Sequence, residues 1–410
     1  MTKDEKFFDK KMDRREFLKK AGIGGAGLAL GISGASAFFA NQTSEEKKIA
    51  DGDEEIHFYG EHQSGITTAM QKNIYFVVLD LHVTDKKTVI QLFKDWTVYS
   101  EKLVEGELVK KDGSNAYLPP TDTGETVGLN PHRLTLTYGI SADFLKKMGM
   151  EGKRPKLFRD MPPFPREQLK EKYTGGDIVI QACADDEQVA FHAIRNLVRK
   201  GKNAVTMRWS QSGFAAIGNR METPRNLFGF KDGTANVKKE SDFDDVVWTD
   251  SNDWMKGGTY MAVRRIQMLL DTWDRTNLQE QENTFGRYKE SGAPFGKKNE
   301  FDEVDLDLKD DNGEPLIPVD AHVRLAKEVG VPIYRRSYSY SDGIIETTGQ
   351  FDTGLLFISF QKDPESFIKI QTNLGNVDKM NEYTKHIGSG LFACFAGIKK
   401  GEYIGQKLFE

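Results

Sequence analysis

The chain has 410 residues, of which 38% are hydrophobic and 11% aromatic, and its formal net charge is −5 at pH 7. This length allows more than one folding unit, and the hydrophobic content excludes an intrinsically disordered chain. The negative net charge gives no electrostatic basis for nucleic acid as a partner, because nucleic-acid-binding proteins carry clustered Lys and Arg.

Residues 1–40 are expected to be an export signal. Arg14 and Arg15 precede residues 21–40, a stretch without charge that contains six glycines and includes the small residues Ala35-Ser36-Ala37. This order is typical of a secretory signal peptide, and the paired arginines resemble the twin-arginine class. It predicts an extracytoplasmic protein, either secreted or held in the cell wall or periplasm. A permanent anchor is the alternative, because about 20 apolar residues can span a bilayer.

The polar residues 41–55 are expected to form a flexible spacer, and the chain after them repeats a strand followed by a helix. Short runs of β-branched and aromatic residues precede amphipathic runs that begin near Asp or Thr, as expected for strands and capped helices. The segments with this pattern are residues 74–96, 177–197, 259–281 and 354–374.

Two such units in each half of the chain predict a duplicated α+β fold. Each half would be an antiparallel sheet with helices packed on its outer face, of the ferredoxin-like type. The first domain is predicted over 56–215 and the second over 216–410. A doubly wound sheet is the competing architecture. Against it, no GxGxxG opens a helix after a strand, no GxxxxGK[ST] occurs, and long irregular stretches interrupt the pattern.

The cysteines and histidines exclude several kinds of site. Cys183 and Cys394 each lie in an apolar run, so we expect two small buried side chains without a disulfide. No CxxC or CxxCH spacing occurs, which excludes a thiolate zinc site and a covalently attached c-type haem. No HExxH is present, so a hydrolytic zinc site has little support.

Three short motifs in the second half carry reactive side chains. NLFGFKDGTAN (226–236) places Asp232 in a loop rich in glycine, and an Asp-Gly pair by itself indicates only a turn. PLIPVDAHVRLAKEVG (315–330) places His322 in the first turns of an expected helix. Arg335 and Arg336 lie in a strand-like run with alternating tyrosines. On spacing alone, a surface histidine and ordinary salt bridges explain these residues.

Taken together, the motifs closely resemble the dye-decolourising peroxidases, and most closely their secreted deferrochelatase/peroxidase branch. The resemblance runs from about residue 56 to the end of the chain. Its specific part is GxxDG, followed by DAHVR and then by an Arg pair. The other segments that carry it are residues 58–66 (FYGEHQSGI), 175–197 and 387–397 (IGSGLFACFAG).

The resemblance implies one non-covalent haem b per chain, with H2O2 as oxidant and phenols, dyes or Fe²⁺ as electron donors. His322 would be the proximal iron ligand, Asp232 the distal acid–base group, and Arg335 rather than Arg336 the distal cation. Asn236 matches a position that in some members helps to order distal water. The residues expected around the cofactor are His322, Gly229, Phe230, Gly233, Thr234, Arg324, Leu355, Phe357 and Asp378.

Elementary chemistry gives reasons for these roles. A carboxylate can carry a proton from one peroxide oxygen to the other, and a permanently charged guanidinium can stabilise the departing oxygen. The second ring N–H of the iron ligand needs an acceptor, for which Asp378 is the candidate and Glu382 the alternative. Leu355 and Phe357, two apart on a strand, share a face and would line the distal pocket, unless both simply fill the core of the sheet.

Other functions stay open. The branch is associated with iron uptake, so the chain could release iron from haem with the porphyrin intact, or oxidise Fe²⁺ for a membrane iron permease. A non-enzymatic haem carrier is a third hypothesis, against which the pairing of an acid with a cation argues. The family often forms dimers, so a homodimer is expected.

Overall fold

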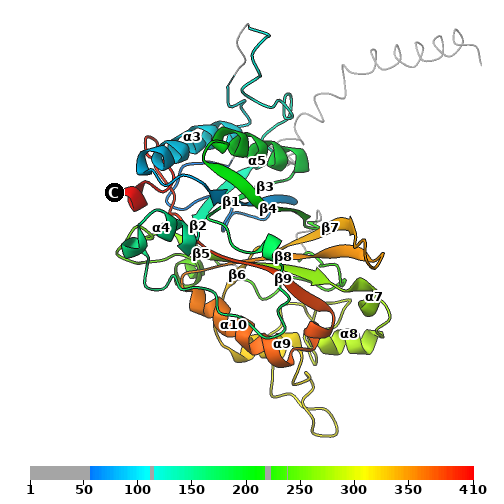
Figure 1. The fold of residues 1–410 in the computed structure, drawn as a ribbon. Coiled ribbons are helices and arrows are strands. Elements are labelled where there is room, and N and C mark those ends of the chain that lie inside the picture. The colour runs from blue at the N-terminus through cyan, green and yellow to red at the C-terminus, as the bar shows by residue number, and fades with distance from the viewer. Residues whose placement is uncertain (1–55, 111–114, 218–222, 238) are drawn as a thin grey trace, which may run out of the picture. The chain divides into compact units, whose positions relative to one another are not determined.

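The computed structural model describes residues 56–110, 115–217, 223–237 and 239–410 (Figure 1). The predicted signal peptide at 1–40 and spacer at 41–55 lie outside the described residues. The chain separates into two units, Met1–Ala50 and Asp51–Glu410, and every described residue belongs to the second. Within these ranges, none of the helices combines the length and the apolar character needed to cross a bilayer.

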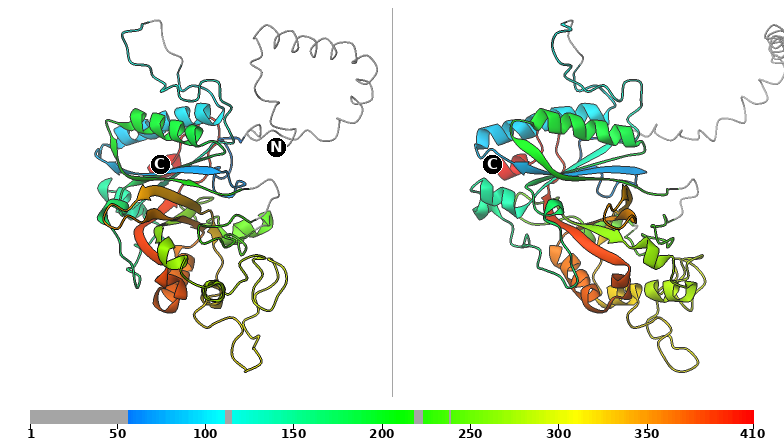
Figure 2. Two further views of the ribbon diagram at one scale, coloured as in Figure 1. Left: turned by 90° about the vertical axis from the view of Figure 1, so that its right-hand side faces the viewer. Right: turned by 45° about the vertical axis from the view of Figure 1, so that its right-hand side comes forward.

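The first half of the described chain is an antiparallel sheet covered on one face by helices α3 (Lys86–Val104) and α5 (Glu187–Gly201) (Figures 1 and 2). The order of strands and helices is βαββαβ, which is the ferredoxin-like arrangement. Asp85 and Asp186 begin the helices, because their carboxylates accept hydrogen bonds from backbone N–H groups of the first turns. In sheet order the strands are β2 (Thr135–Ile140), β3 (Ile178–Ala184), β1 (Asn73–Leu81) and β4 (Val205–Phe214).

The second half repeats this arrangement with longer insertions. β8 pairs with β5 on one side and with the short strands β6 and β7 on the other, and β9 pairs with the free side of β5. Helices α9 and α10 lie on the outer face of this sheet (Figure 1). The elements are β5 (Thr259–Met268), α7 (Leu270–Trp273), α8 (Leu278–Phe285), α9 (His322–Glu328), β6 (Tyr334–Arg335), β7 (Tyr338–Ile344), β8 (Phe351–Gln361), α10 (Pro364–Val377) and β9 (Thr384–Cys394).

The predicted α+β fold with duplicated ferredoxin-like halves is confirmed. All four predicted strand–helix segments are present, although the helix of the third is divided into α7 and α8. Asn277 begins α8 by accepting a hydrogen bond from Glu280 N, which explains the division. The short remaining helices are α4 (Ala142–Lys147), α6 (Phe243–Val246) and α11 (Gln406–Phe409), with 3₁₀ turns at Glu151–Lys153, Glu171–Tyr173, Glu240–Asp242 and Lys379–Glu382.

The two halves share one sheet. Among the described residues, β2 joins β9 at Gly139↔Cys394 and Ile140↔Ala393, and β4 joins β7 at Phe214↔Ser339. Because β5 also pairs with β8, the sheet closes on itself. The domain boundary predicted between 215 and 216 therefore falls within a continuous structure and stays a prediction.

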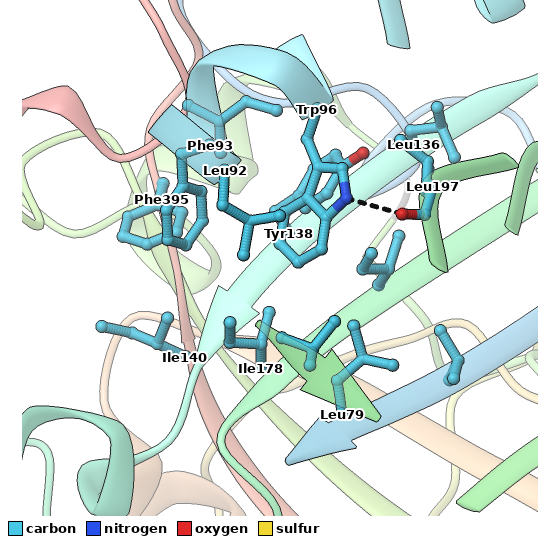
Figure 3. Packing of buried hydrophobic residues seen from close by; sticks show 14 of the residues in the cluster. Leu79, Leu92, Phe93, Trp96, Leu136, Tyr138, Ile140, Ile178, Leu197 and Phe395 are labelled. Atoms are coloured by element: carbon cyan, nitrogen blue, oxygen red, sulfur yellow. Dashed lines mark hydrogen bonds between the residues drawn. The ribbon is translucent and has the colours of Figure 1, made fainter. Parts of the chain in front are cut away.

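Two hydrophobic layers hold the halves in place. Between the strands of the two halves lies a buried cluster that contains Cys183 and Cys394, both free, as predicted. Under α3 and α5, Trp96 is fully buried and donates from Nε1 to Leu197 O at 2.8 Å (Figure 3). Phe395, from the end of the second half, packs against Phe93 in this core at a ring distance of 5.8 Å. Each such buried side chain contributes roughly 1.5–3 kcal/mol.

Candidate active site

A cavity of about 510 Å³ lies in the second half, lined by residues of β5, β8 and β9 and of helices α9 and α10. Ile266, Leu355 and Phe357 contribute an apolar wall from the sheet, and Phe367 and Leu374 contribute another from α10. The volume is within the range of about 300–1,000 Å³ that is usual for cofactor sites. An apolar cavity of this size favours a large hydrophobic ligand that is held by a few polar groups.

His322 is the first residue of α9 and lines the cavity. Its Nδ1 donates to Asp378 Oδ2 at 2.7 Å, and Asp378 is 4% exposed. A backbone hydrogen bond from Lys379 N to Asp320 O, 3.1 Å long, joins the turns that carry the two side chains. Nδ1 is therefore committed as a donor, and Nε2 is the nitrogen left to bind a metal.

The carboxylate of Asp378 also shifts the pKa of the ring. Burial on its own would lower the pKa of His322, but the neighbouring Asp378 outweighs it, so the pKa of His322 lies above its usual value. Of the two acceptors that the sequence proposed, Asp378 and Glu382, the structure places Asp378 in the hydrogen bond.

Asp232 and Arg335 form a second polar group at the cavity. Arg335 Nη1 donates to Asp232 Oδ1 at 3.2 Å, and both side chains line the cavity. Asp232 lies between Gly229 and Gly233, whose φ angles of +82° and +119° are rarely adopted by residues with a side chain. The glycines therefore allow the tight loop that brings this carboxylate to β6.

Asn236 holds Arg335 in place. Its Oδ1 accepts from Arg335 N and its Nδ2 donates to Arg335 O, both at 2.7 Å. Asn236 is not among the residues that line the cavity. These contacts position the main chain of Arg335, and the ordering of distal water by Asn236 stays a prediction.

The other predicted cofactor residues divide into two groups. Gly233, Thr234, Leu355, Phe357 and Asp378 line the cavity, as do His322 and Asp232. Leu355 and Phe357 share one face of β8, in agreement with their spacing.

Gly229, Phe230 and Arg324 do not line the cavity. Arg324 follows His322 by two residues, which rotates it by about 200° around the helix. Its Nε and Nη2 donate to the backbone oxygens of Ile317 and Leu306. Phe230 stacks on Phe285 at a centroid distance of 4.0 Å and is 2% exposed. Phe230 therefore supports the cavity wall through Phe285, which lines the cavity.

Sequence reasoning missed His386 and Arg287, which both line the cavity. Arg264 Nε donates to His386 Nδ1 at 3.3 Å. Burial and the neighbouring Arg264 lower the pKa of His386 to about 3, so the ring is neutral and carries its proton on Nε2. A single His near the start of a strand and an Arg after a helix carry no motif, so only the fold identifies them.

The site fits a metal that is carried by an organic group. In the part of the chain that the structure describes, no group of three or more His, Cys, Asp or Glu side chains could hold a metal ion by itself. One oriented imidazole at a large apolar cavity is instead the ligand set of an iron porphyrin, which brings the other four iron ligands with it.

Comparison with known proteins agrees with this geometry. The model of the Dyp-type peroxidase N-terminal domain matches residues 63–215, and that of the C-terminal domain matches residues 223–399. The chain is 38% identical over 373 residues to a deferrochelatase of Yersinia pseudotuberculosis serotype I, covering 86% of this chain and 84% of that protein. It is 37% identical over 372 residues to a deferrochelatase of Escherichia coli strain K12, covering 86% and 87%.

Solved structures give the same result. Ferric DtpA from Streptomyces lividans is 36% identical, with a TM-score of 0.82 over 89% of this chain and 99% of that one. A DyP-type peroxidase from Streptomyces coelicolor is 36% identical, with a TM-score of 0.83 over 89% and 100%. With both domain models matched and these relatives aligned over most of its length, the chain belongs to the Dyp-type peroxidase family and is a haem-dependent peroxidase.

Proposed function

We propose that the cavity binds one non-covalent haem b per chain and that His322 Nε2 would bind its iron. The observation that carries the proposal is the hydrogen bond from His322 to Asp378, which leaves Nε2 as the free nitrogen at an apolar cavity. The absence of CxxCH from the sequence supports non-covalent binding. When bound, the haem supplies the redox chemistry by which electrons reach peroxide.

Asp232 and Arg335 are the side chains that act on peroxide in this proposal. Arg335 engages Asp232 Oδ1, so Asp232 Oδ2 is the oxygen available to accept a proton from one peroxide oxygen and return it to the other. The guanidinium of Arg335 then stabilises the negative charge on the departing oxygen. Leu355 and Phe357 keep bulk water away from this transfer. A haem carrier would have no need for the pair.

An optical spectrum of protein purified with haem tests the cofactor and its ligand together. We expect a Soret band of histidine-ligated ferric haem, a pyridine haemochrome of the b type, one haem per chain, and complete extraction of the haem by acid and butanone. His322→Ala should lose the band, and added imidazole should restore part of it. His82→Ala, which changes an exposed histidine, is the control. A normal Soret band in His322→Ala would contradict the proposal.

The proposed electron donors are phenols, dyes or Fe²⁺. Rates of H2O2 consumption with a phenol, an anthraquinone dye and Fe²⁺ would rank them. Oxidation of none of the three would contradict this assignment.

A second activity is release of iron from haem with the porphyrin intact. It is favoured by the similarity to relatives named deferrochelatase, which are 36–38% identical over most of their length. Incubation with haem followed by fluorescence of free protoporphyrin measures it directly. Recovery of intact haem alone would exclude this activity.

Export by the twin-arginine pathway is part of the proposal and is supported by Arg14-Arg15 before the uncharged residues 21–40. In the organism, Arg14→Lys with Arg15→Lys should keep the protein in the cytoplasm, whereas export of this variant would contradict the proposal. Outside the cytoplasm, we propose that the enzyme works as a homodimer with a membrane iron permease in iron transport. Light scattering and co-purification with the permease would test these two associations.

A further inference from the structure

The loop that carries Asp232 is held from behind by residues 286–300, the segment after α8 that we name the clasp. Arg225, at the start of the loop, joins the two. Its Nη1 donates to Gly229 O at 2.7 Å, within the loop, and its Nη2 donates to Glu290 O at 2.8 Å, within the clasp. The position of the loop therefore depends on a distant part of the chain.

Glu300, at the end of the clasp, makes the most direct contacts. Its carboxylate accepts hydrogen bonds from Thr223 Oγ1, from Lys231 Nζ at 2.6 Å and from Thr234 Oγ1 at 2.9 Å. Lys231 and Thr234 lie on either side of Asp232. Glu300 is 9% exposed. Burial would raise the pKa of Glu300, but these donors lower it below its usual value, so the carboxylate is ionised.

Glu300 acts through its neighbours. Among the described residues, Lys231, Thr234 and Arg287 line the cavity, whereas Glu300 does not. Arg287 Nη1 donates to Glu300 O at 3.1 Å. A side chain at Gly292 would meet Lys231 at 2.8 Å, so the clasp approaches the loop closely.

Lys231 gives these contacts a chemical consequence. It precedes Asp232 and shares the cavity wall with it, so its ammonium is a potential competitor of Arg335 for the Asp232 carboxylate. A cation that approaches within about 4–6 Å of a carboxylate lowers its pKa and weakens it as a base. The ion pair with Glu300 occupies Lys231 and leaves Arg335 as the partner of Asp232.

We propose that Glu300 is a positioning residue for the peroxide reaction, which fixes the residues on either side of Asp232 and holds Lys231 away from it. The inference rests on the proposed role of Asp232 as the proton carrier. Asp232 pairs with Arg335 of β6 and interacts electrostatically with His322 of α9. The other charged groups considered are Lys231 and Arg287, which line the same cavity, and Arg287 interacts electrostatically with Arg335.

The test compares haem-loaded variants by stopped-flow mixing with H2O2 across a pH series, with each rate expressed per bound haem. Glu300→Gln keeps one acceptor oxygen, the position to which both threonines donate, but releases Lys231. We expect its rate to fall about 10-fold or more, and the acid limb of its pH profile to move to lower pH. Lys231→Met combined with Glu300→Gln should return the limb towards the wild-type position. Glu314→Gln, an exposed carboxylate after the clasp, is the matched control and should match wild type.

Asp232→Asn, measured in the same series, separates this inference from the proposed function. If Asp232→Asn loses the peroxide reaction while Glu300→Gln keeps the wild-type rate and acid limb, this inference alone is overturned. If Glu300→Gln lowers haem content or Tm with an unchanged rate per haem, its role is structural and the inference is also overturned. A wild-type rate in Asp232→Asn would overturn both.

Discussion

Arg335 and Arg336 are adjacent in sequence, yet their guanidinium groups lie on opposite sides of the sheet. Arg335 lines the cavity and donates to Asp232 Oδ1 at 3.2 Å. Arg336 is 1% exposed and donates to Gln71 Oε1 and Thr68 O of the first half. Successive side chains of an extended chain point to opposite faces. Arg335 therefore lies at the site, and Arg336 forms hydrogen bonds with the first half of the chain.

Exchange of each arginine for leucine should therefore affect a different property of the protein, the reaction rate for Arg335 and the stability of the fold for Arg336. Arg335→Leu should slow the reaction with H2O2 by about 10²–10³-fold, with little change in Tm. Arg336→Leu should leave the buried Gln71 Oε1 and the partly buried Thr68 O without this donor. The buried acceptor alone should destabilise the fold by about 1–3 kcal/mol. Stopped-flow rates per haem and chemical denaturation measure the two effects. The reverse pattern would show that the two arginines are wrongly assigned.

Asp232→Asn should slow peroxide reduction by roughly 10²–10⁴-fold, because the amide cannot accept the proton. It keeps nearly the same shape, so haem content and the Soret band should remain normal. Asp311→Asn, an exposed residue of the second half, is the control. Unchanged peroxide kinetics in Asp232→Asn would remove this residue from the mechanism.

Asp378→Asn should weaken haem binding by about 10–100-fold, because the group that orients a metal-binding histidine is lost. The measurement is the transfer of haem to apomyoglobin. Glu382→Gln, the exposed alternative acceptor, should keep wild-type affinity. Equal losses in both variants would mean that the charge of this region, and not the hydrogen bond to His322, is responsible.

The stability of the haem-free protein should depend on pH through His322. Its pKa in the folded protein is raised by Asp378. The stabilisation is thus complete below the usual His pKa of about 6.5 and is lost as the pH rises through the raised value. The difference in unfolding free energy between wild type and Asp378→Asn, about 1.5–3 kcal/mol for a charged hydrogen bond, should shrink from pH 6 to pH 9. A constant difference would show that His322 does not titrate in this range.

Gly354→Ala should disrupt the pairing of β5 and β8 behind the cavity wall. A Cβ at Gly354 would meet Ile266 O at 1.9 Å and the hydroxyl of Tyr340 at 2.6 Å. Overpacking of this kind costs about 1–3 kcal/mol or more, which thermal unfolding would detect. Gly152→Ala, at a position where a Cβ meets nothing within 4 Å, is the control. Equal Tm values for the two variants would contradict the strand pairing.

Elements that depend on neighbours in sequence could be predicted, and those that depend on distant contacts could not. The strand–helix segments were predicted because Asp85, Asp186 and Asp363 cap helices within a few residues of apolar runs. β9 was not identified by pattern, because its glycines resemble a loop. A Cβ at Gly388 would meet Arg265 and Tyr173 at 2.9 Å, so close packing explains the glycine.

The same distinction between local sequence and distant contacts applies to the residues of the candidate site. The family resemblance of the motifs implied roles for His322, Asp232 and Arg335, and spacing along a strand placed Leu355 and Phe357 on one face. Phe230 and Arg324 are neighbours of these groups in sequence, which does not determine the direction of their side chains. The turn of the helix at Arg324 and the aromatic packing of Phe230 direct them elsewhere.

By itself, the amino-acid sequence determined which local elements form and which reactive side chains are present, because capping, periodicity and motif spacing act over a few residues. Only the tertiary structure decided which of these side chains meet. Asp232 and Arg335 are 103 residues apart, and His322 and Asp378 are 56 apart. The pairing of strands within the sheet and the packing of helices against it bring such residues into contact. The hydrogen bond of His322 to Asp378, the contacts of Asn236 with the main chain of Arg335 and the contacts of Glu300 with the Asp232 loop all follow from that packing.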